Sequence, residues 1–146
     1  MSSTFDRKFI NVRFDRDREL RGGWIMFRVI IAGTRHFNDY RLLREFADKL
    51  LENKRAAGEK IIIVSGHCYG ADLLGERYAR ERGYQVEVYE AQWSQYGPGA
   101  GPRRNRQMAE AADALIAFWD GKSRGTKNMI DEAKALNLAV RVKVYK

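Results

Sequence analysis

From residue 27 onward, short apolar runs alternate with longer segments in which apolar residues recur every three or four positions. The runs are rich in β-branched residues, as buried parallel strands are, and they cover residues 27–33, 61–64, 85–89, 114–119 and 139–144. The periodic segments predict helices at residues 39–55, 71–82, 103–112 and 126–136. Strands that alternate with helices imply right-handed crossovers and a sheet covered on both faces. The pattern therefore predicts an α/β domain of three layers with a mostly parallel five-stranded sheet.

The first 25 residues differ from the rest, because they show little apolar periodicity and carry many charged side chains. Within them, residues 9–14 predict a short edge strand at most. Codons for the sequence Arg21, Gly22, Gly23 can spell a purine-rich ribosome-binding sequence at a suitable distance from Met26, which makes Met26 a candidate true or alternative start. We predict an N-terminal extension over residues 1–25 and one domain over residues 26–146.

The composition is typical of a soluble globular protein, with 45% hydrophobic and 32% charged residues. No apolar run approaches the ~20 residues that cross a bilayer, and the first residues lead into no signal-peptide core. We therefore expect a cytoplasmic protein without a membrane partner. Cys68 is the single cysteine, and with two histidines it does not make up a structural zinc site. We predict no metal and no cofactor.

The formal net charge of +8 and the isoelectric point near 9.8 favour a polyanionic or phosphorylated partner. Basic side chains fall at or beside the ends of the predicted strands, at Arg35, Arg103, Arg104, Arg106, Lys122, Arg124 and Lys127. Guanidinium groups bind phosphate through paired hydrogen bonds. On a helix, Arg103 and Arg106 share one face and Arg104 points elsewhere, so only part of this set is expected to reach a ligand.

Glycines and small polar residues concentrate in the loops that follow the predicted strands, where ligands bind in parallel α/β sheets. Residues 65–72 follow a strand and open a helix, so free N–H groups and the helix dipole would favour a phosphate there. The candidate ligand-binding residues of this loop are Ser65, Gly66, Gly70 and Asp72. In the alternative interpretation, the glycines only make a tight turn and Asp72 only favours the helix start.

Residues 120–126 have the same layout of strand, small polar residues and helix. The candidates here are Asp120, Ser123, Gly125 and Thr126, although helix capping alone would also explain Thr126. The loop after the first strand adds Gly33, Thr34 and Arg35. These three loops are expected to meet at one edge of the sheet and to form the binding site together.

Two further features have a chemical and a structural interpretation. Trp93 and Tyr96 lie in a predicted loop, where either ring offers a surface for a base to stack on or seals the core from above. Cys68 next to His67 suggests a nucleophile, yet no sequence feature orients the pair, and a small buried thiol is the alternative. The catalytic residues therefore stay unassigned.

Motifs with a shared order and spacing cover about four-fifths of the chain. They are residues 33–39, 65–66, 70–72, 91–93, 96–97, 100–102, 104–105, 108, 113, 118–121 and 123–126. In these residues the chain resembles the YspA (cpYpsA-related) branch of the SLOG superfamily, which also includes the LOG phosphoribohydrolases and the DNA-processing protein DprA. The resemblance implies a Rossmann-like fold and a pocket for a nucleotide derivative, with Arg104 and Asn105 among its binding residues.

The resemblance makes ligand binding the first functional hypothesis. Some SLOG domains are thought to sense nucleotide signals in bacterial and phage conflict systems. A sensor, carrier or sponge for a phosphorylated nucleotide or a nucleotide-derived small molecule is therefore expected, in a bacterium or a phage. The sequence leaves a homo-oligomer open.

An enzyme that resembles LOG is the second hypothesis. LOG enzymes cleave the N-glycosidic bond of nucleoside monophosphates and carry an essential glutamate at the end of a Gly-Thr-x-x-Glu motif. Met129 stands in the glutamate's place here, and a thioether transfers no proton. Arg104 and Asp113 match the family, so the binding half of the site is kept while its acid–base member is lost. Another carboxylate, Asp72 or Asp120, is not excluded.

Nucleic-acid binding is the third hypothesis. Residues 102–109 resemble the arginine-rich segment with which DprA contacts single-stranded DNA, and the net charge agrees. The chain lacks the additional length of DprA, which ranks this hypothesis last. Steep salt dependence would distinguish it from binding of a mononucleotide.

Overall fold

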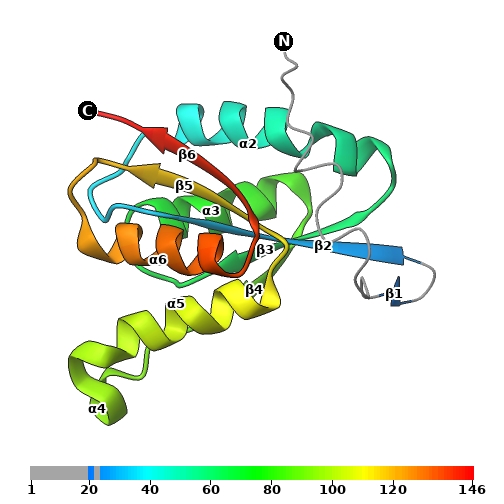
Figure 1. Ribbon diagram of the computed structural model, residues 1–146. Helices are drawn as coiled ribbons and strands as arrows, with labels where there is room; N and C mark the ends of the chain where they lie inside the picture. The colour runs from blue at the N-terminus through cyan, green and yellow to red at the C-terminus, as the bar shows by residue number, and fades with distance from the viewer. Residues whose placement is uncertain (1–19, 22–23) are drawn as a thin grey trace.

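The computed structural model describes residues 20–21 and 24–146 of the chain. Five parallel strands form the sheet in the order β4-β3-β2-β5-β6 (Figure 1). Their bounds are β2 Trp24–Gly33, β3 Lys60–Ser65, β4 Gln85–Val88, β5 Ala114–Trp119 and β6 Ala139–Val144. A two-residue strand, β1 Leu20–Arg21, pairs antiparallel with the start of β2. The predicted α/β, Rossmann-like fold is confirmed.

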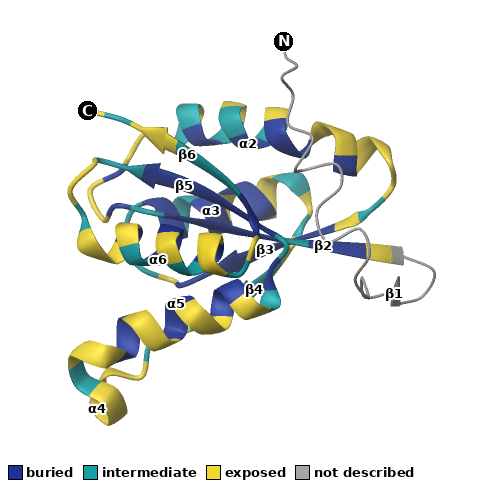
Figure 2. Ribbon diagram, in the orientation of Figure 1, coloured by how far each residue is buried: buried dark blue, intermediate teal, exposed yellow. Residues whose placement is uncertain are grey.

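Helices cover both faces of the sheet. On one face, α2 (Tyr40–Ala56) and α3 (Ala71–Arg82) enclose a core that includes Phe27, Ile63 and Phe118. On the other face, α5 (Ala100–Ala111) and α6 (Arg124–Ala135) enclose a second core that includes Ile30 and Leu115. Buried residues therefore run along the central strands and the inner sides of these helices (Figure 2).

The structure differs from the predicted elements most clearly at three places. Strand β2 begins at Trp24, three residues before the strand predicted from residue 27, while the division into an N-terminal extension and a domain at Met26 stays a prediction. The loop expected before residue 103 contains a short helix α4 (Trp93–Tyr96) and the 3-10 turn η1 (Gly97–Gly99). Helix α5 begins at Ala100, because Pro102 lies in its first turn, where a missing N–H costs no helical hydrogen bond. The edge strand expected at residues 9–14 lies outside the described residues.

The order of the strands reverses between β2 and β5, because β3 and β4 follow on one side of β2 and β5 and β6 lie on the other. At the carboxyl ends of these two strands Gly33 pairs with Phe118, and the N–H of Thr34 donates to the carbonyl of Phe118 at 2.9 Å. Such a switch point is where open α/β sheets bind ligands. In the described part of the chain, none of the helices is both long and apolar enough to span a membrane.

Candidate functional site

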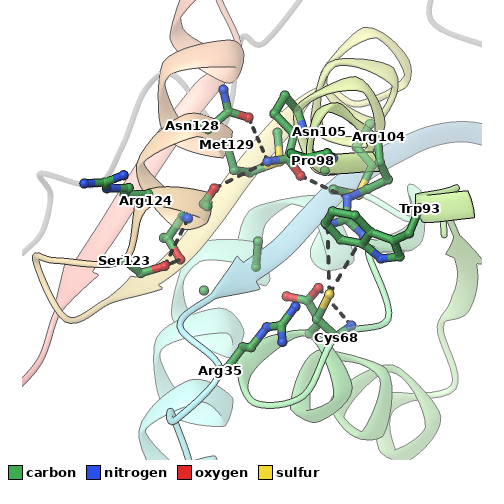
Figure 3. A pocket seen from close by; sticks show the side chains of 18 residues that line it. Arg35, Cys68, Trp93, Pro98, Arg104, Asn105, Ser123, Arg124, Asn128 and Met129 are labelled. Atoms are coloured by element: carbon green, nitrogen blue, oxygen red, sulfur yellow. Dashed lines mark hydrogen bonds between the residues drawn. The ribbon is translucent and has the colours of Figure 1, made fainter. Parts of the chain in front are cut away.

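A pocket of about 450 Å³ opens at this switch point, beyond the carboxyl ends of β2 and β5 and against α5 and α6 (Figure 3). Most of the predicted ligand-binding residues line it, from all three loops and from α5. They are Gly33, Arg35, Asp72, Trp93, Arg104, Asn105, Ser123, Gly125 and Thr126. The topology thus brings together residues that are up to 93 positions apart in the sequence (33 to 126).

The remaining predicted residues do not line the pocket but build its frame. They are Thr34, Ser65, Gly66, Gly70 and Asp120. Thr34 is buried, and its Oγ1 accepts a hydrogen bond from the N–H of Asp120 at 3.2 Å, which ties the loop after β2 to the loop after β5. Gly70 has a φ of +86°, and a side chain there would collide with the carbonyl of Thr34. These two contacts hold the three loops in register.

Ser65 is fully buried behind the pocket wall and is already hydrogen-bonded within the protein. Its hydroxyl donates to Glu76 Oε2 at 2.7 Å and accepts from the N–H of His67 at 3.0 Å. The ring nitrogen Nδ1 of His67 lies 2.7 Å from the same Glu76 oxygen, which raises the pKa of His67. Ser65 therefore anchors its loop to α3 instead of presenting a hydroxyl to the pocket.

Most N–H groups at the start of α3 are also used inside the protein. The N–H of Ala71 donates to the carbonyl of Thr34 at 3.4 Å, and that of Leu73 donates to the carbonyl of Cys68 at 3.2 Å. The sequence-based expectation of a free helix start at residues 65–72 is therefore met only in part. The physical reason is that Gly70 and Thr34 bring backbone carbonyls against this helix end.

Asp72 supplies the pocket with a buried carboxylate. It is 6% exposed, and its Oδ2 accepts a hydrogen bond from the N–H of Cys68 at 3.2 Å. Burial raises the pKa of Asp72 to about 6, although the N–H of Cys68 and the charge of Arg104 act in the opposite direction. Near neutral pH the ionised form of Asp72 is therefore favoured over the protonated form by only a modest free energy. The side chain can accept hydrogen bonds from ribose hydroxyls, or it can hold a proton.

Arg104 is a buried cation from α5 whose hydrogen bonds go to neutral groups. It is 8% exposed, and Nη1 donates to the carbonyls of Gly66 at 2.8 Å and Tyr89 at 3.3 Å. Its Nε donates to Asn105 Oδ1 at 3.0 Å, and Nη2 lies 3.9 Å from the sulfur of Cys68. Over the described part of the chain, this guanidinium forms no ion pair. A buried charge of this kind favours an anion in the pocket beside it.

The start of α6 is built differently from that of α3. Asp120 Oδ1 accepts hydrogen bonds from the N–H groups of Ser123 and Lys122 at 2.8 Å each, which lower the pKa of Asp120. Ser123 then caps α6, and its Oγ accepts from the N–H of Thr126 at 3.3 Å. Within residues 24–146 the N–H groups of Arg124 and Gly125 donate to no acceptor. They are available to an anion at the positive end of the helix dipole.

Asn105 joins this helix start to the arginine. Its Nδ2 donates to Asn128 Oδ1 at 2.9 Å and to the carbonyl of Gly125 at 3.4 Å, while its Oδ1 accepts from Arg104 Nε. The side chain therefore fixes both α6 and the guanidinium. Asn105 lines the pocket, yet its amide is largely occupied by these partners.

The exposed basic residues fall into two groups, at the pocket and away from it. Arg35 and Arg124 are exposed at the pocket, and in the described residues neither side chain has an ion-pair partner. Arg106 lies outside the pocket and pairs with Glu110 and Glu132, each at 3.5 Å. The guanidinium of Arg103 lies over a tyrosine ring, 4.1 Å from its centroid. The separation of Arg104 from Arg103 and Arg106 on α5 follows the helical phase expected from the sequence.

Sequence reasoning did not select several residues that line the pocket. Ala32, Pro98 and Asn128 carried no recognisable signal, because each is an ordinary helix, strand or loop residue in the sequence, and Met108 stands out only as part of the family motif. Cys68 and Arg124 also line the pocket, and neither is among the ligand-binding residues predicted from the sequence. The spacing of Arg124 immediately before Gly125 in a strand-to-helix loop was a usable signal.

The nucleophile hypothesis for the Cys68 and His67 pair finds no geometric support. The ring of His67 is directed to Glu76, whereas the sulfur of Cys68 lies against the guanidinium of Arg104. Asp113 lies at the opposite end of the sheet, where its Oδ2 accepts from the N–H of Arg28 at 2.9 Å. Its match to the LOG enzymes therefore corresponds to a structural role at the start of β5.

Two comparisons with known proteins gave matches to this chain. Residues 27–96 match the sequence profile of the YspA, cpYpsA-related SLOG family. The resemblance inferred from the sequence is confirmed. The matched residues cover β2 from Phe27 onward, β3 and β4, and they include the pocket residues Gly33, Arg35, Asp72 and Trp93.

Among solved structures, the DNA processing protein A (DprA) from Streptococcus pneumoniae is similar in fold, with a TM-score of 0.61 and 20% sequence identity. The alignment covers 80% of this chain and 50% of the DprA chain, so the chain spans about half the length of that protein. At this identity the likeness concerns the fold alone. No curated protein gives a match to the chain.

Proposed function

We propose that the pocket binds a phosphorylated nucleotide or a nucleotide-derived ligand and that the protein acts as a sensor, carrier or sponge for it. The observation that carries this proposal is the imbalance of charge around the pocket. Arg35, Arg104 and Arg124 line it, and Asp72 is the one carboxylate among its lining residues. Burial raises the pKa of Asp72 to about 6, so this carboxylate is still mostly ionised at neutral pH, and the three guanidinium groups outnumber it.

Two groups support a phosphate as the anionic part of the ligand. The guanidinium of Arg104 is fixed by Asn105 and two backbone carbonyls before any ligand arrives, so its orientation costs little on binding. The N–H groups of Arg124 and Gly125 offer a second set of donors at the start of α6. Hydrogen bonds of this kind to a charged acceptor contribute about 1.5–3 kcal/mol each.

Binding without hydrolysis is favoured by the residue at the bottom of the pocket. Met129 is 2% exposed and lines the pocket at the position where the LOG motif carries its glutamate. Acid–base assistance contributes roughly 10²–10⁴ in rate, and a thioether offers none. Incubation with adenosine 5′-monophosphate is expected to release no free adenine above background.

Hydrolysis is the second candidate, and Asp72 is the observation that favours it. Its carboxyl group lines the pocket and has a pKa raised to about 6, as general acids in enzymes often have. Adenine release that is present in the wild-type protein and lost in Asp72→Asn would establish this candidate in place of simple binding.

The test of the proposal is a binding measurement with exposed arginines removed. Adenosine 5′-monophosphate and guanosine 5′-monophosphate are titrated by calorimetry into the wild type and into Arg35→Ala and Arg124→Ala. Each substitution is expected to weaken binding about 5-fold or more, because one donor to the phosphate is lost. Arg41→Ala on α2 is the matched control, since Arg41 is exposed and lies away from the pocket.

If Arg41→Ala weakened nucleotide binding as much as the pocket variants do, the loss of affinity would reflect only the change in net charge. Unchanged binding in both pocket variants would contradict the proposal. The same titrations at two salt concentrations separate a mononucleotide from a nucleic acid, whose affinity falls much more steeply with salt. Native mass spectrometry of the purified protein identifies any nucleotide that is already bound.

A further inference from the structure

A large aromatic side chain at the edge of the pocket has no role in the core. Trp93, in the short helix α4, is 51% exposed and lines the pocket, and it belongs to neither of the two hydrophobic cores. Its exposed ring offers apolar surface to the pocket that a ligand would cover. The sequence-based alternative, in which Trp93 seals the core from above, therefore does not fit its position.

The indole of Trp93 is held at its far end. A Cβ at Gly101 would lie 3.3 Å from Cη2 of the ring and 4.0 Å from each of Cζ2 and Cζ3, so the tip of the six-membered ring rests on the surface of α5 where a side chain is absent. Contact through the tip leaves ring surface exposed at the pocket. A planar ligand group can therefore stack on an already positioned surface.

The pocket has two chemically different sides. Trp93 lies on one side, and Ser123 and Arg124 at the start of α6 lie on the other (Figure 3). The carboxylate of Asp72 also lines the cavity. A volume of about 450 Å³ is within the usual range for small-molecule sites of roughly 300–1,000 Å³.

We propose that Trp93 is the platform on which the base of a nucleotide stacks, while the phosphate binds the opposite side of the pocket at the start of α6. This inference rests on the proposed function and deepens it, because it requires a ligand with an aromatic base and not a sugar phosphate or free phosphate. Stacking on an indole face is tolerant of base identity. The site is therefore expected to bind adenine and guanine nucleotides with similar affinity, and pyrimidine nucleotides more weakly because their rings cover less of the indole.

The experiment compares three probes that share the phosphate and differ in the base. Adenosine 5′-monophosphate, ribose 5-phosphate and inorganic phosphate are titrated by calorimetry into the wild type, Trp93→Leu and Trp93→Phe. In Trp93→Leu, affinity for adenosine 5′-monophosphate is expected to fall roughly 5- to 150-fold, the loss that corresponds to one base–aromatic stack. Affinity for ribose 5-phosphate is expected to stay unchanged, and Trp93→Phe should keep most of the wild-type affinity.

Tyr96→Leu is the matched control, because Tyr96 is a partly exposed ring of the same helix that does not line the pocket. It is expected to bind all three probes as the wild type does. If the wild type bound adenosine 5′-monophosphate and ribose 5-phosphate with equal affinity, the proposed stacking of the base on Trp93 would be wrong, whereas the proposed phosphate site would still be supported. A parallel loss for both probes in Trp93→Leu would mean that the ring only holds the pocket in shape, which also overturns it. Absence of binding for all three probes would contradict both the platform and the proposed function.

Discussion

The loops after β3 and β5 look alike in the sequence, since each follows an apolar strand, contains small polar residues and opens a helix. In the structure they are used in opposite ways. The loop after β3 hydrogen-bonds inward, because its Ser65 hydroxyl donates to Glu76 and the first N–H of α3 donates to the carbonyl of Thr34. The loop after β5 leaves the N–H groups of Arg124 and Gly125 open to the pocket.

The difference shows that a strand-to-helix loop is a ligand site only if nothing in the protein occupies its donors first. In the first loop the partners come from elsewhere in the fold, and this buried network fixes the position of Asp72. In the second loop Asp120 and Ser123 satisfy only the donors around the turn. One loop therefore forms a wall of the pocket, and the other offers free donors to a ligand.

The largest expected difference is between valine substitutions at the glycine of each loop. A Cβ at Gly66 would lie 2.6 Å from Arg104 Nη1 and 2.9 Å from Asp72 Oδ2, so Gly66→Val should displace both side chains and destabilise the fold by about 1–3 kcal/mol. A Cβ at Gly125 meets nothing within 4 Å, so Gly125→Val should change the free energy of unfolding by less than about 1 kcal/mol. Urea unfolding of the two variants measures this difference.

Gly125→Val is nevertheless expected to abolish nucleotide binding, because Gly125 lines the pocket and a valine side chain there would crowd a phosphate at the free N–H groups of α6. Calorimetry with adenosine 5′-monophosphate measures this effect in a protein that keeps its fold. Unchanged affinity in Gly125→Val would remove this loop from the site, and equal stability of the two variants would remove the contrast between the loops.

Arg104 and Arg124 provide the second comparison, because one guanidinium supports the first loop and the other stands free at the second. Arg104→Gln should weaken phosphate binding by about 1.5–3 kcal/mol and also lower stability, since the carbonyls of Gly66 and Tyr89 lose a donor. Arg124→Gln should weaken binding with stability unchanged within about 0.5 kcal/mol, as expected for an exposed side chain. Binding that survives in Arg104→Gln at wild-type affinity would show that this arginine is structural only.

Asp72→Asn tests the buried carboxylate of the first loop. With a pKa raised from 3.8 to about 6, the folded protein holds a proton that the unfolded chain releases, so stability should fall by about 2 kcal/mol as pH rises from about 4 to about 6. The Asn variant should lack this decline. The raised pKa of His67 also makes stability fall as pH rises, in both proteins. The quantity to compare is therefore the difference in free energy of unfolding between the wild type and Asp72→Asn, measured with urea at pH 4.5, 6 and 7.5. A difference independent of pH would show that Asp72 has an ordinary pKa.

The smallest expected effects come from the two loop serines. Ser65→Ala removes a buried donor to Glu76 and should cost about 1–3 kcal/mol of stability without a direct effect on binding. Ser123→Ala removes the cap of α6 and should cost about 1 kcal/mol, together with weaker phosphate binding. If Ser65→Ala weakened binding while thermal unfolding stayed unchanged, the inward role assigned to Ser65 would be wrong.

The fold was predictable because each buried strand is a compact apolar run and each helix begins or ends near a recognisable residue. The start of α5 was missed because Gly99, Gly101 and Pro102 are typical of loops, whereas the first turn of a helix tolerates all three. Strand pairing then fixed which loops meet, so residues as distant as Arg35, Trp93 and Ser123 line one pocket, while their part in ligand binding stays a prediction.

The details of the site were less predictable because they depend on non-local side-chain contacts. Nothing at Ser65 indicates that Glu76, eleven positions later, would take its hydrogen bond. Asn128 lines the pocket and accepts a hydrogen bond from Asn105 of another helix, and neither feature can be read from its own sequence context. Sequence patterns therefore identified loops that line the pocket, and the structure was needed to tell which donors in them are free.

The parallel direction of the strands has a practical consequence for handling this protein. Strand β2 begins at Trp24, nine residues and about 30 Å from its pocket end at Gly33, so the chain enters this strand at the end remote from the pocket. Strand β6 runs in the same direction, and the N–H of Tyr145 donates to the carbonyl of Trp119, so the chain leaves the sheet on the pocket side. For surface immobilisation or fusion to a reporter, attachment after β6 therefore places the anchor beside the pocket, whereas the start of β2 lies at the opposite end of the strands.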